Sequence, residues 1–234
     1  MKRSIFFCFT FLFLFLGNLN ANNRVFATVE TNIGDFKMEL YPENAPKTVA
    51  NFRKLAKENF YSDIYFHRVF PDYFVQAGCP LTKEDTLRAN DGKGHAGYFI
   101  KNEINPKSFG YDTLLVKNSV FHLEVPVGVG IQDSTVQTYL ESKNFSFTDS
   151  LKSLPHIYGA VSMASINAGK FSSQFFIVTR EEGIPHYNGK NTVFGEIVEG
   201  MNIIRKIEEL PLDDNNNPLK ENQAVIKDIS IKTE

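Results

Sequence analysis

Cysteine is scarce in this sequence of 234 residues, and tryptophan is absent. Of the two cysteines, Cys8 lies in an apolar N-terminal run whose removal would leave Cys79 alone, which excludes an intramolecular disulfide. A lone thiol is more often buried and inert than reactive. Cysteine and histidine residues at zinc-ligand spacing are also missing, so we expect neither a metal nor another cofactor. Stability must then come from an apolar core.

A large excess of either charge is missing as well. The chain has 25 Lys and Arg residues against 27 Asp and Glu residues. Loss of residues 1–21 would remove the two cations Lys2 and Arg3 and leave 23 against 27, a formal charge of −4. This balance indicates no nucleic-acid partner. With 42% apolar residues, the composition is that of a globular protein with one sizeable core.

The N-terminus is typical of a cleaved secretory signal peptide covering residues 1–21. Two cations precede the apolar run Ile5–Leu16 of 12 residues, and Ala21 ends a candidate cleavage site. The run is shorter than the ~20 residues that cross a bilayer, although an uncleaved anchor is the alternative. We therefore expect a periplasmic or secreted, monomeric mature chain, residues 22–234, with no stable membrane span.

Short alternating segments dominate the mature chain. We expect strands in 25–30, 34–40, 64–77, 159–179, 193–198 and 225–231, and helices in 45–59 and 200–210. The first two strands form a hairpin through Thr31-Asn32, and Asn44 is a candidate cap for the first helix. Many short strands with two or three helices favour a β-barrel or a sandwich.

Residues 104–158 fit this scheme poorly, because 55 residues are far more than an ordinary connection. They contain a β-like run at 121–132 and a candidate short helix from Ser134 to Lys143. We interpret the segment as an insertion with some structure of its own.

Three motifs point to one family. The first is FHRVFPDYFVQ at 66–76, the second is GAVSMA at 159–164 followed by SQFFI at 173–177, and the third is NGKNTVFG at 188–195. Together they resemble the cyclophilin family, and the resemblance covers 25–103 and 159–231. It implies a mainly β fold, a closed eight-stranded antiparallel β-barrel capped by two α-helices. It also implies peptidyl-prolyl cis/trans isomerase activity on proline-containing polypeptides.

The residues suit that chemistry independently of the resemblance. Rotation about a prolyl amide has a barrier of ~18–20 kcal/mol, because the bond is resonance-stabilised. A hydrogen bond to the amide nitrogen, an apolar slot for the proline ring and anchoring of the flanking backbone can lower it. A 10⁵-fold acceleration needs only about 7 kcal/mol. No bond breaks, and the chain offers no Ser/His/Asp or Cys/His set for nucleophilic chemistry, which argues against a hydrolase.

The resemblance assigns roles to individual residues. Arg68 would contact the prolyl amide, Gln76 would hold the guanidinium and contact substrate backbone, and Phe176 would be the floor of the proline slot. His67 would have a structural hydrogen-bonding role beside them. The residues expected to bind substrate are His67, Tyr73, Phe74, Gly92, Ala164, Ser165, Gln174, Tyr187 and Asn191. The ordinary alternatives are a surface salt bridge for Arg68, a hydrogen-bonded barrel residue for Gln76 and core packing for the aromatic residues.

The sequence departs from the family pattern around the slot. His186 stands where many members have Trp, Tyr187 replaces Leu and Asn191 replaces His. The missing Trp argues against binding of cyclosporin, whereas the arginine, glutamine and slot phenylalanine are all present. These departures and the long segment leave an alternative open. The chain would then be a proline-peptide-binding or chaperone module on the same scaffold, with weak or no catalysis.

Overall fold

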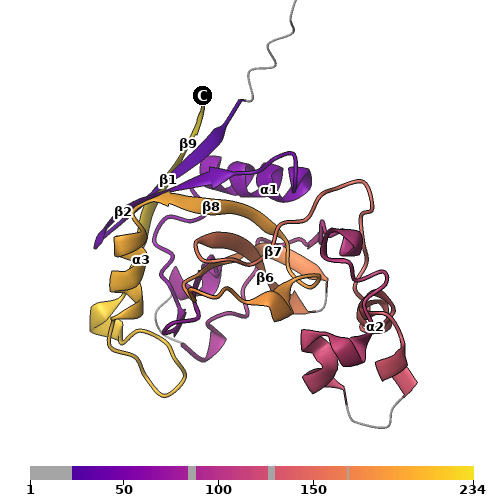
Figure 1. The fold of residues 1–234 in the computed structure, drawn as a ribbon. Helices are drawn as coiled ribbons and strands as arrows, with labels where there is room; N and C mark the ends of the chain where they lie inside the picture. The colour runs from indigo at the N-terminus through magenta and orange to yellow at the C-terminus, as the bar shows by residue number, and fades with distance from the viewer. Residues whose placement is uncertain (1–22, 84–87, 126–129, 168) are drawn as a thin grey trace, which may run out of the picture.

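The computed structural model describes residues 23–83, 88–125, 130–167 and 169–234, and its main feature is one curled antiparallel sheet (Figure 1). The strands are β1 Val25–Thr31, β2 Gly34–Leu40, β3 Arg68–Phe70, β4 Phe74–Ala77, β5 Ile100–Lys101, β6 Ala160–Asn167, β7 Lys170–Val178, β8 Val193–Glu199 and β9 Ile226–Thr233. Their order is β3-β4-β7-β6-β8-β2-β1-β9, with β5 paired to β7. The candidate signal peptide, residues 1–21, lies outside the described residues.

Alternation along the strands gives the sheet one apolar face, which lies against the core. β1 and β2 form the predicted hairpin, with Val25 opposite Leu40 and Thr31 opposite Gly34. Along β2 the side chains of Phe36, Met38 and Leu40 are buried in the core. Successive side chains of a strand point to opposite faces, so a strict alternation places one apolar row inward.

The prediction of a closed barrel is wrong, because within the described residues no ladder joins the edge strands β3 and β9. The edges meet just before β3, where Tyr65 forms a bridge with Val225, and Ile226 accepts from the N–H of Asp63 and donates to the carbonyl of Ile64. β3 is three residues long, and the backbone N–H of Val69 donates to the carbonyl of Asn216, 2.8 Å away. The turn around Asn216 thus occupies the edge that a closing strand would need, and the sheet is an open half-barrel.

The described residues contain three α-helices, the two implied by the resemblance and the candidate short helix of the 104–158 segment. These are α1 Pro46–Lys57, α2 Val136–Ser142 and α3 Met201–Glu208. α1 and α3 confirm the helices expected in 45–59 and 200–210, and each buries an apolar stripe against the sheet. α2 lies in the 104–158 segment, where a short helix was expected. Among the described residues no helix is long and apolar enough to cross a membrane.

The cap predicted for α1 is wrong. Asn44 donates its side-chain amide to the carbonyl of Lys152, 2.7 Å away, and Ala45 stands at the cap position. The free N–H groups of Lys47 and Thr48 donate instead to the carboxylate of Glu103, at 3.0 and 2.8 Å. Glu103 is buried, so a negative charge from a distant segment neutralises the positive end of the helix.

Short helices make up much of the rest. They are the 3₁₀-helices η1 Pro80–Lys83, η2 Arg88–Asn90, η3 Pro106–Phe109, η4 Val116–Asn118, η5 Val120–Glu124, η6 Gly130–Asp133, η7 Pro185–Tyr187 and η8 Lys220–Asn222. Those of residues 104–158 gather with α2 beside the sheet (Figure 1) around an apolar cluster of their own. Its buried members are Tyr111, Val116, Phe121, Val125, Val136, Tyr139 and Leu140.

The strand expected at 121–132 is wrong where it is described. Phe121–Glu124 is part of η5, Gly130–Asp133 is η6, and 126–129 lie outside the described residues. Ser119 caps η5 through its hydroxyl, which accepts from the N–H of Phe121 at 3.1 Å. Phe121 in η5 and Val125, the extended residue that follows it, are buried, whereas Leu123 between them is 84% exposed. The apolar residues of this run therefore do not share one face, as those of a half-buried strand would.

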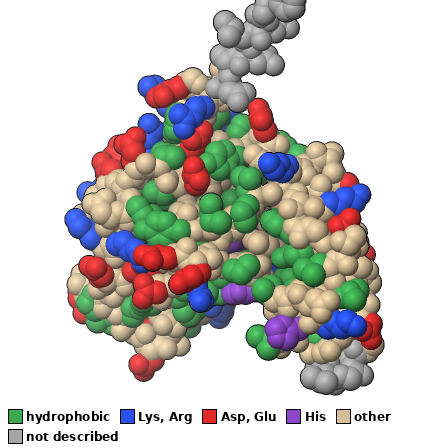
Figure 2. All heavy atoms as spheres, in the orientation of Figure 1, with side chains coloured by type: hydrophobic (Ala, Val, Ile, Leu, Met, Phe, Trp, Pro, Cys, Tyr) green, Lys and Arg blue, Asp and Glu red, His purple; other side chains and the backbone are tan. Residues whose placement is uncertain are grey.

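Hydrophobic side chains also reach the surface. Figure 2 shows them gathered in the middle of one face, with Lys, Arg, Asp and Glu concentrated around its margin. The functional candidates named above lie on strands β3, β4, β6 and β7 and the loops around them.

Candidate functional site

Strand register places the three central candidates in one row. Arg68 on β3 lies opposite Gln76 on β4, and Gln76 lies opposite Phe176 on β7. Directly opposed residues of antiparallel strands project to the same face of a sheet. The row therefore presents a guanidinium, an amide and an aromatic ring side by side.

This row opens into a groove of about 770 Å³. Eleven of the twelve predicted site residues line it: His67, Arg68, Phe74, Gln76, Gly92, Ala164, Ser165, Gln174, Phe176, Tyr187 and Asn191. Motifs separated by more than a hundred residues thus meet in one place. The structure shows this placement, and the roles assigned to the residues stay predictions.

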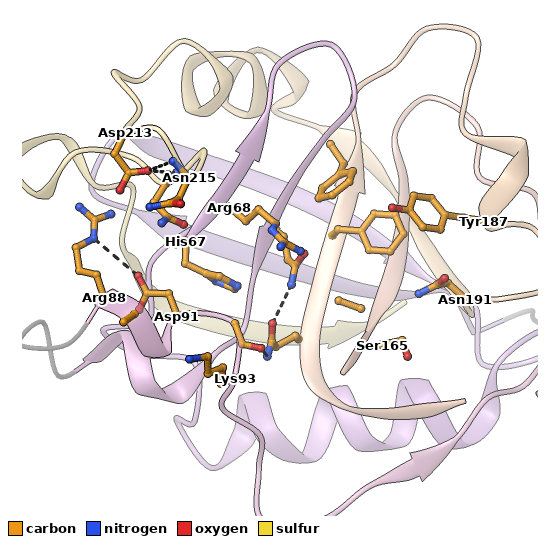
Figure 3. A pocket seen from close by; sticks show the side chains of 18 residues that line it. His67, Arg68, Arg88, Asp91, Lys93, Ser165, Tyr187, Asn191, Asp213 and Asn215 are labelled. Carbon is orange, nitrogen blue, oxygen red and sulfur yellow. Dashed lines mark hydrogen bonds and ion pairs between the residues drawn. The ribbon is translucent and has the colours of Figure 1, made fainter. Parts of the chain in front are cut away.

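Arg68 is exposed and has no polar partner among the described residues. Among the described residues its guanidinium makes no hydrogen bond or ion pair, and its Cζ lies 5.6 Å from the ring centroid of Phe70. The alternative role of Arg68, a surface salt bridge, therefore has no acidic partner among the described residues. Figure 3 shows Arg68 in the middle of the groove, between Tyr187 and Asn191 on one side and Arg88, Asp91 and Asp213 on the other.

Gln76 bonds to a different group from the one expected. Its amide nitrogen donates to Oε1 of Gln174 at 2.8 Å, and no described hydrogen bond joins it to Arg68. Gln174 in turn donates to the carbonyls of Gly92 and Gly94, each 2.8 Å away. The prediction that Gln76 holds the guanidinium is wrong for this conformation. The two glutamines instead tie β4 and β7 to the glycine loop.

The apolar part of the groove is a slot around Phe176. The ring of Phe74 lies 5.3 Å from it and that of Tyr187 5.5 Å, measured between centroids. Ala164 adds a small side chain at the rim. Tyr73 does not line the groove: its ring stacks on His186 at 5.9 Å, and its hydroxyl is hydrogen-bonded to Nε2 of His186. Tyr73 thus lies behind the wall formed by Phe74.

His156 supports the slot and was missed by the sequence reasoning. Its ring lies parallel to that of Phe176, with centroids 5.7 Å apart and an interplanar angle of 11°. Nδ1 lies 2.9 Å from Oδ1 of Asn188, and Nε2 lies 2.9 Å from the Ser162 hydroxyl. Burial lowers the pKa of His156 to about 4. A neutral imidazole with its proton on Nδ1 donates to Asn188, and its Nε2 accepts from the Ser162 hydroxyl, which otherwise donates to the Thr192 carbonyl at 3.1 Å.

His67 is buried beside the glycine loop, and the hydrogen-bonding role expected for it stays a prediction. Neither ring nitrogen has a hydrogen-bond partner by geometry among the described residues. Burial, aided by the charge of Arg68, lowers the pKa of His67 to about 3. A Cβ atom on Gly92 would lie 3.5 Å from its Nε2, so the glycine backbone approaches the ring closely.

The loop after η7 supplies the far wall. Asn191 donates its side-chain amide to the carbonyl of Met163 at 2.9 Å, which fixes it to β6. Tyr187 is half-buried, and burial raises its pKa. Cys79 is fully buried behind the groove, where its sulfur accepts from the N–H of Gly94 at 3.3 Å.

The polar half of the groove was not foreseen. It is lined by Arg88, Ala89, Asp91, Lys93, Asp213, Asn215 and Asn217. The sequence marked 213–217 only as a surface turn, which it is, because Oδ1 of Asp213 accepts from the N–H groups of Asn215 and Asn217. No local signal tells that the turn lies against β3. Among the described residues, no group of His, Cys, Asp or Glu could hold a metal ion.

Comparison with solved structures shows the class of fold. A crystal structure of a cyclophilin type peptidyl-prolyl cis-trans isomerase from Cryptosporidium parvum has a TM-score of 0.61 and 23% identity, covering 90% of this chain and 99% of that one. The same protein was also crystallised in the presence of the dipeptide Ala-Pro. The present chain thus has the mainly β cyclophilin fold, with its sheet open.

Comparison of sequences shows the family. The family model described as cyclophilin type peptidyl-prolyl cis-trans isomerase/CLD matches residues 26–231. Peptidyl-prolyl cis-trans isomerase B of Bacillus subtilis is 34% identical over 73% of this chain and 81% of its own length. Peptidyl-prolyl cis-trans isomerase-like 2 of Gibberella zeae is 32% identical over 88% of this chain, which spans only 26% of that relative. The chain belongs to the cyclophilin-type peptidyl-prolyl cis-trans isomerase family.

Proposed function

We propose that this chain is a monomeric isomerase that accelerates cis/trans isomerisation of X–Pro bonds in proline-containing polypeptides. One observation carries the proposal: the unpaired guanidinium of Arg68 lies in register with an aromatic slot. A proline ring seated on Phe176 brings its amide bond to the Arg68 side of the groove. No described acid or hydrogen-bond acceptor pairs with the guanidinium, which lies over the ring of Phe70.

The geometry lowers the barrier without forming a covalent bond. Twisting the prolyl amide localises a lone pair on its nitrogen, and the N–H groups of Arg68 stabilise that state more than the planar one. Gln76 and Gln174 border the bound backbone and hold each other in place. The slot grips the ring while the flanking chain rotates, so binding energy is used for orientation.

The N-terminal segment supports an export of the protein, so that the reaction would take place outside the cytoplasm. A cleaved signal peptide at 1–21 would deliver residues 22–234 to a periplasm or to the outside of the cell. Uncatalysed X–Pro isomerisation takes tens to hundreds of seconds and can limit folding. Exported proteins are therefore the proposed clients. Mass spectrometry of the exported protein should find a chain that begins at Asn22, and a chain retaining Met1 would contradict the export proposal.

The decisive experiment measures isomerisation of a proline-containing peptide by wild type, Arg68→Ala and Arg68→Lys. The loss expected for Arg68→Ala is about 10²-fold in kcat/KM, the cost typical of removing one transition-state donor. Lysine lacks the planar fork and should recover only part of it. Arg53→Ala is the matched control, since Arg53 is an exposed arginine of α1 outside the groove. A wild-type protein that leaves the rate unchanged refutes the proposal.

The departures at His186, Tyr187 and Asn191 support one alternative, a binding or chaperone module with little catalysis. It predicts that proline peptides bind to wild type and to Arg68→Ala with no acceleration by either. Folding assistance that survives Arg68→Ala would also favour the binding or chaperone module.

A further inference from the structure

Residues 104–158 touch the proposed groove through one of its walls. That wall is the loop at 185–191, which supplies Tyr187 and Asn191 to the groove. The loop is held to β6 by the Asn191 amide, but much of its outer side rests on the 104–158 segment. Three separate contacts make this connection.

The first contact is an ion pair. Nζ of Lys190 lies 2.6 and 2.8 Å from the two carboxylate oxygens of Glu124. The Tyr139 hydroxyl donates to the same carboxylate at 3.1 Å, and the ammonium lies 4.9 Å from the ring centroid of Phe121. The side chains of Lys190 and Glu124 are 19% and 34% exposed, so solvent screens this pair less than a fully exposed one.

The second contact is the seat of Gly189. A Cβ atom at this position would lie 2.9 Å from Cδ1 of Leu140 and 3.0 Å from Cε2 of Tyr111. Both belong to the buried cluster of the segment, so the loop backbone rests directly on that cluster. The φ of +80° also suits glycine at this position.

The third contact is His156, near the end of the segment. Its backbone N–H and its Nδ1 both lie 2.9 Å from Oδ1 of Asn188, which fixes the middle of the loop. The same ring stacks on Phe176, the floor of the slot. One side chain therefore links floor and wall.

We propose that residues 104–158 act as a buttress that holds the 185–191 loop in the conformation that completes the slot. Glu124 and His156 are its positioning residues, and neither lines the groove. The proposal rests on the proposed function in that the slot is taken as the substrate site. Whether the segment is an insertion into the family fold stays a separate prediction.

Amide hydrogen exchange in Glu124→Gln tests the buttress without any need for activity. The probes are the N–H groups of Tyr187, Lys190 and Asn191, which donate to the carbonyls of Ile184, Tyr187 and Tyr187. Losing the ion pair should speed their exchange about threefold. Asp133→Asn is the matched control, because it removes a 2.7 Å ion pair to Lys117 within the same segment but away from the loop.

Isomerisation kinetics supply the second readout. Glu124→Gln should lower kcat/KM for a proline peptide about threefold, mainly by raising KM, since the slot is less preorganised. The reversed pair Glu124→Lys with Lys190→Glu should recover part of the loss, whereas Asp133→Asn should match wild type.

Unchanged loop exchange in Glu124→Gln, or equal effects in Asp133→Asn, would overturn the buttress even if the wild-type enzyme is active. An inactive wild type would instead refute the proposed function, and the exchange data would still decide whether the segment holds the loop.

Discussion

Acidification is expected to destabilise this fold through its two buried imidazoles, His67 and His156. Both are almost fully buried, and burial lowers the pKa of each, to about 3 and about 4 respectively. In the unfolded chain each ring titrates near 6.5. Below that pH the unfolded state binds protons that the folded state refuses, so unfolding is favoured.

The magnitude for His156 follows from the two pKa values. Its contribution to stability is fully present above pH ~6.5 and is lost as the pH falls toward about 4. Over that window the slope is about 1.4 kcal/mol per pH unit, which gives at most roughly 3 kcal/mol from His156. His67 adds to the slope in the same direction.

Urea unfolding of wild type and His156→Gln at pH 7, 6, 5 and 4.5 isolates the effect. Glutamine keeps donor and acceptor groups near Asn188 and Ser162 but cannot titrate, so the variant should start less stable at pH 7 and lose stability less steeply. His95→Gln serves as the control, because it replaces an exposed histidine. Parallel curves for wild type and His156→Gln would refute the assignment of a neutral, buried imidazole.

Three further outcomes are expected. Glu103→Ala should cost about 2 kcal/mol of unfolding free energy in urea, because two helix N–H groups lose a buried carboxylate; a loss no larger than for Glu58→Ala would contradict this. Gly78→Ala should cost at least ~2 kcal/mol, since its φ is +92° and its Cβ would lie 2.4 Å from the Ser173 carbonyl oxygen, whereas Gly130→Ala should be nearly neutral. The thiol of Cys79 should react with a thiol reagent only after unfolding, and rapid labelling of the native protein would show that it is accessible.

How far the sequence predicts the fold depends on how local the signal is. The β1–β2 hairpin, α1 and α3 are confirmed because alternation and helical periodicity report burial within one element. Closure of the barrel, in contrast, depends on contacts between distant parts of the chain. It depends on whether β3 finds a partner along its free edge, and a turn more than 140 residues later takes part of that edge.

The 121–132 run shows the same limit inside a single segment. Apolar residues at 121, 123 and 125 suit a strand by alternation, but Phe121 lies in η5 and Leu123 is exposed. Pairing with a neighbouring strand would favour a strand here. In this structure the packing partners are instead side chains of the segment's own cluster. Short apolar runs are ambiguous for this reason.

Only some residues of the candidate site could be predicted from local sequence patterns. Arg68, Gln76 and Phe176 could be named in advance because each belongs to a contiguous motif, and strand register then brings those motifs together. Glu103, His156 and the 213–217 turn carry no such local pattern. Each matters through a contact made far along the chain: a helix end, the underside of the slot, the edge of β3. The residues that would touch substrate can thus be predicted from sequence, whereas those that hold them in place become visible only in the folded chain.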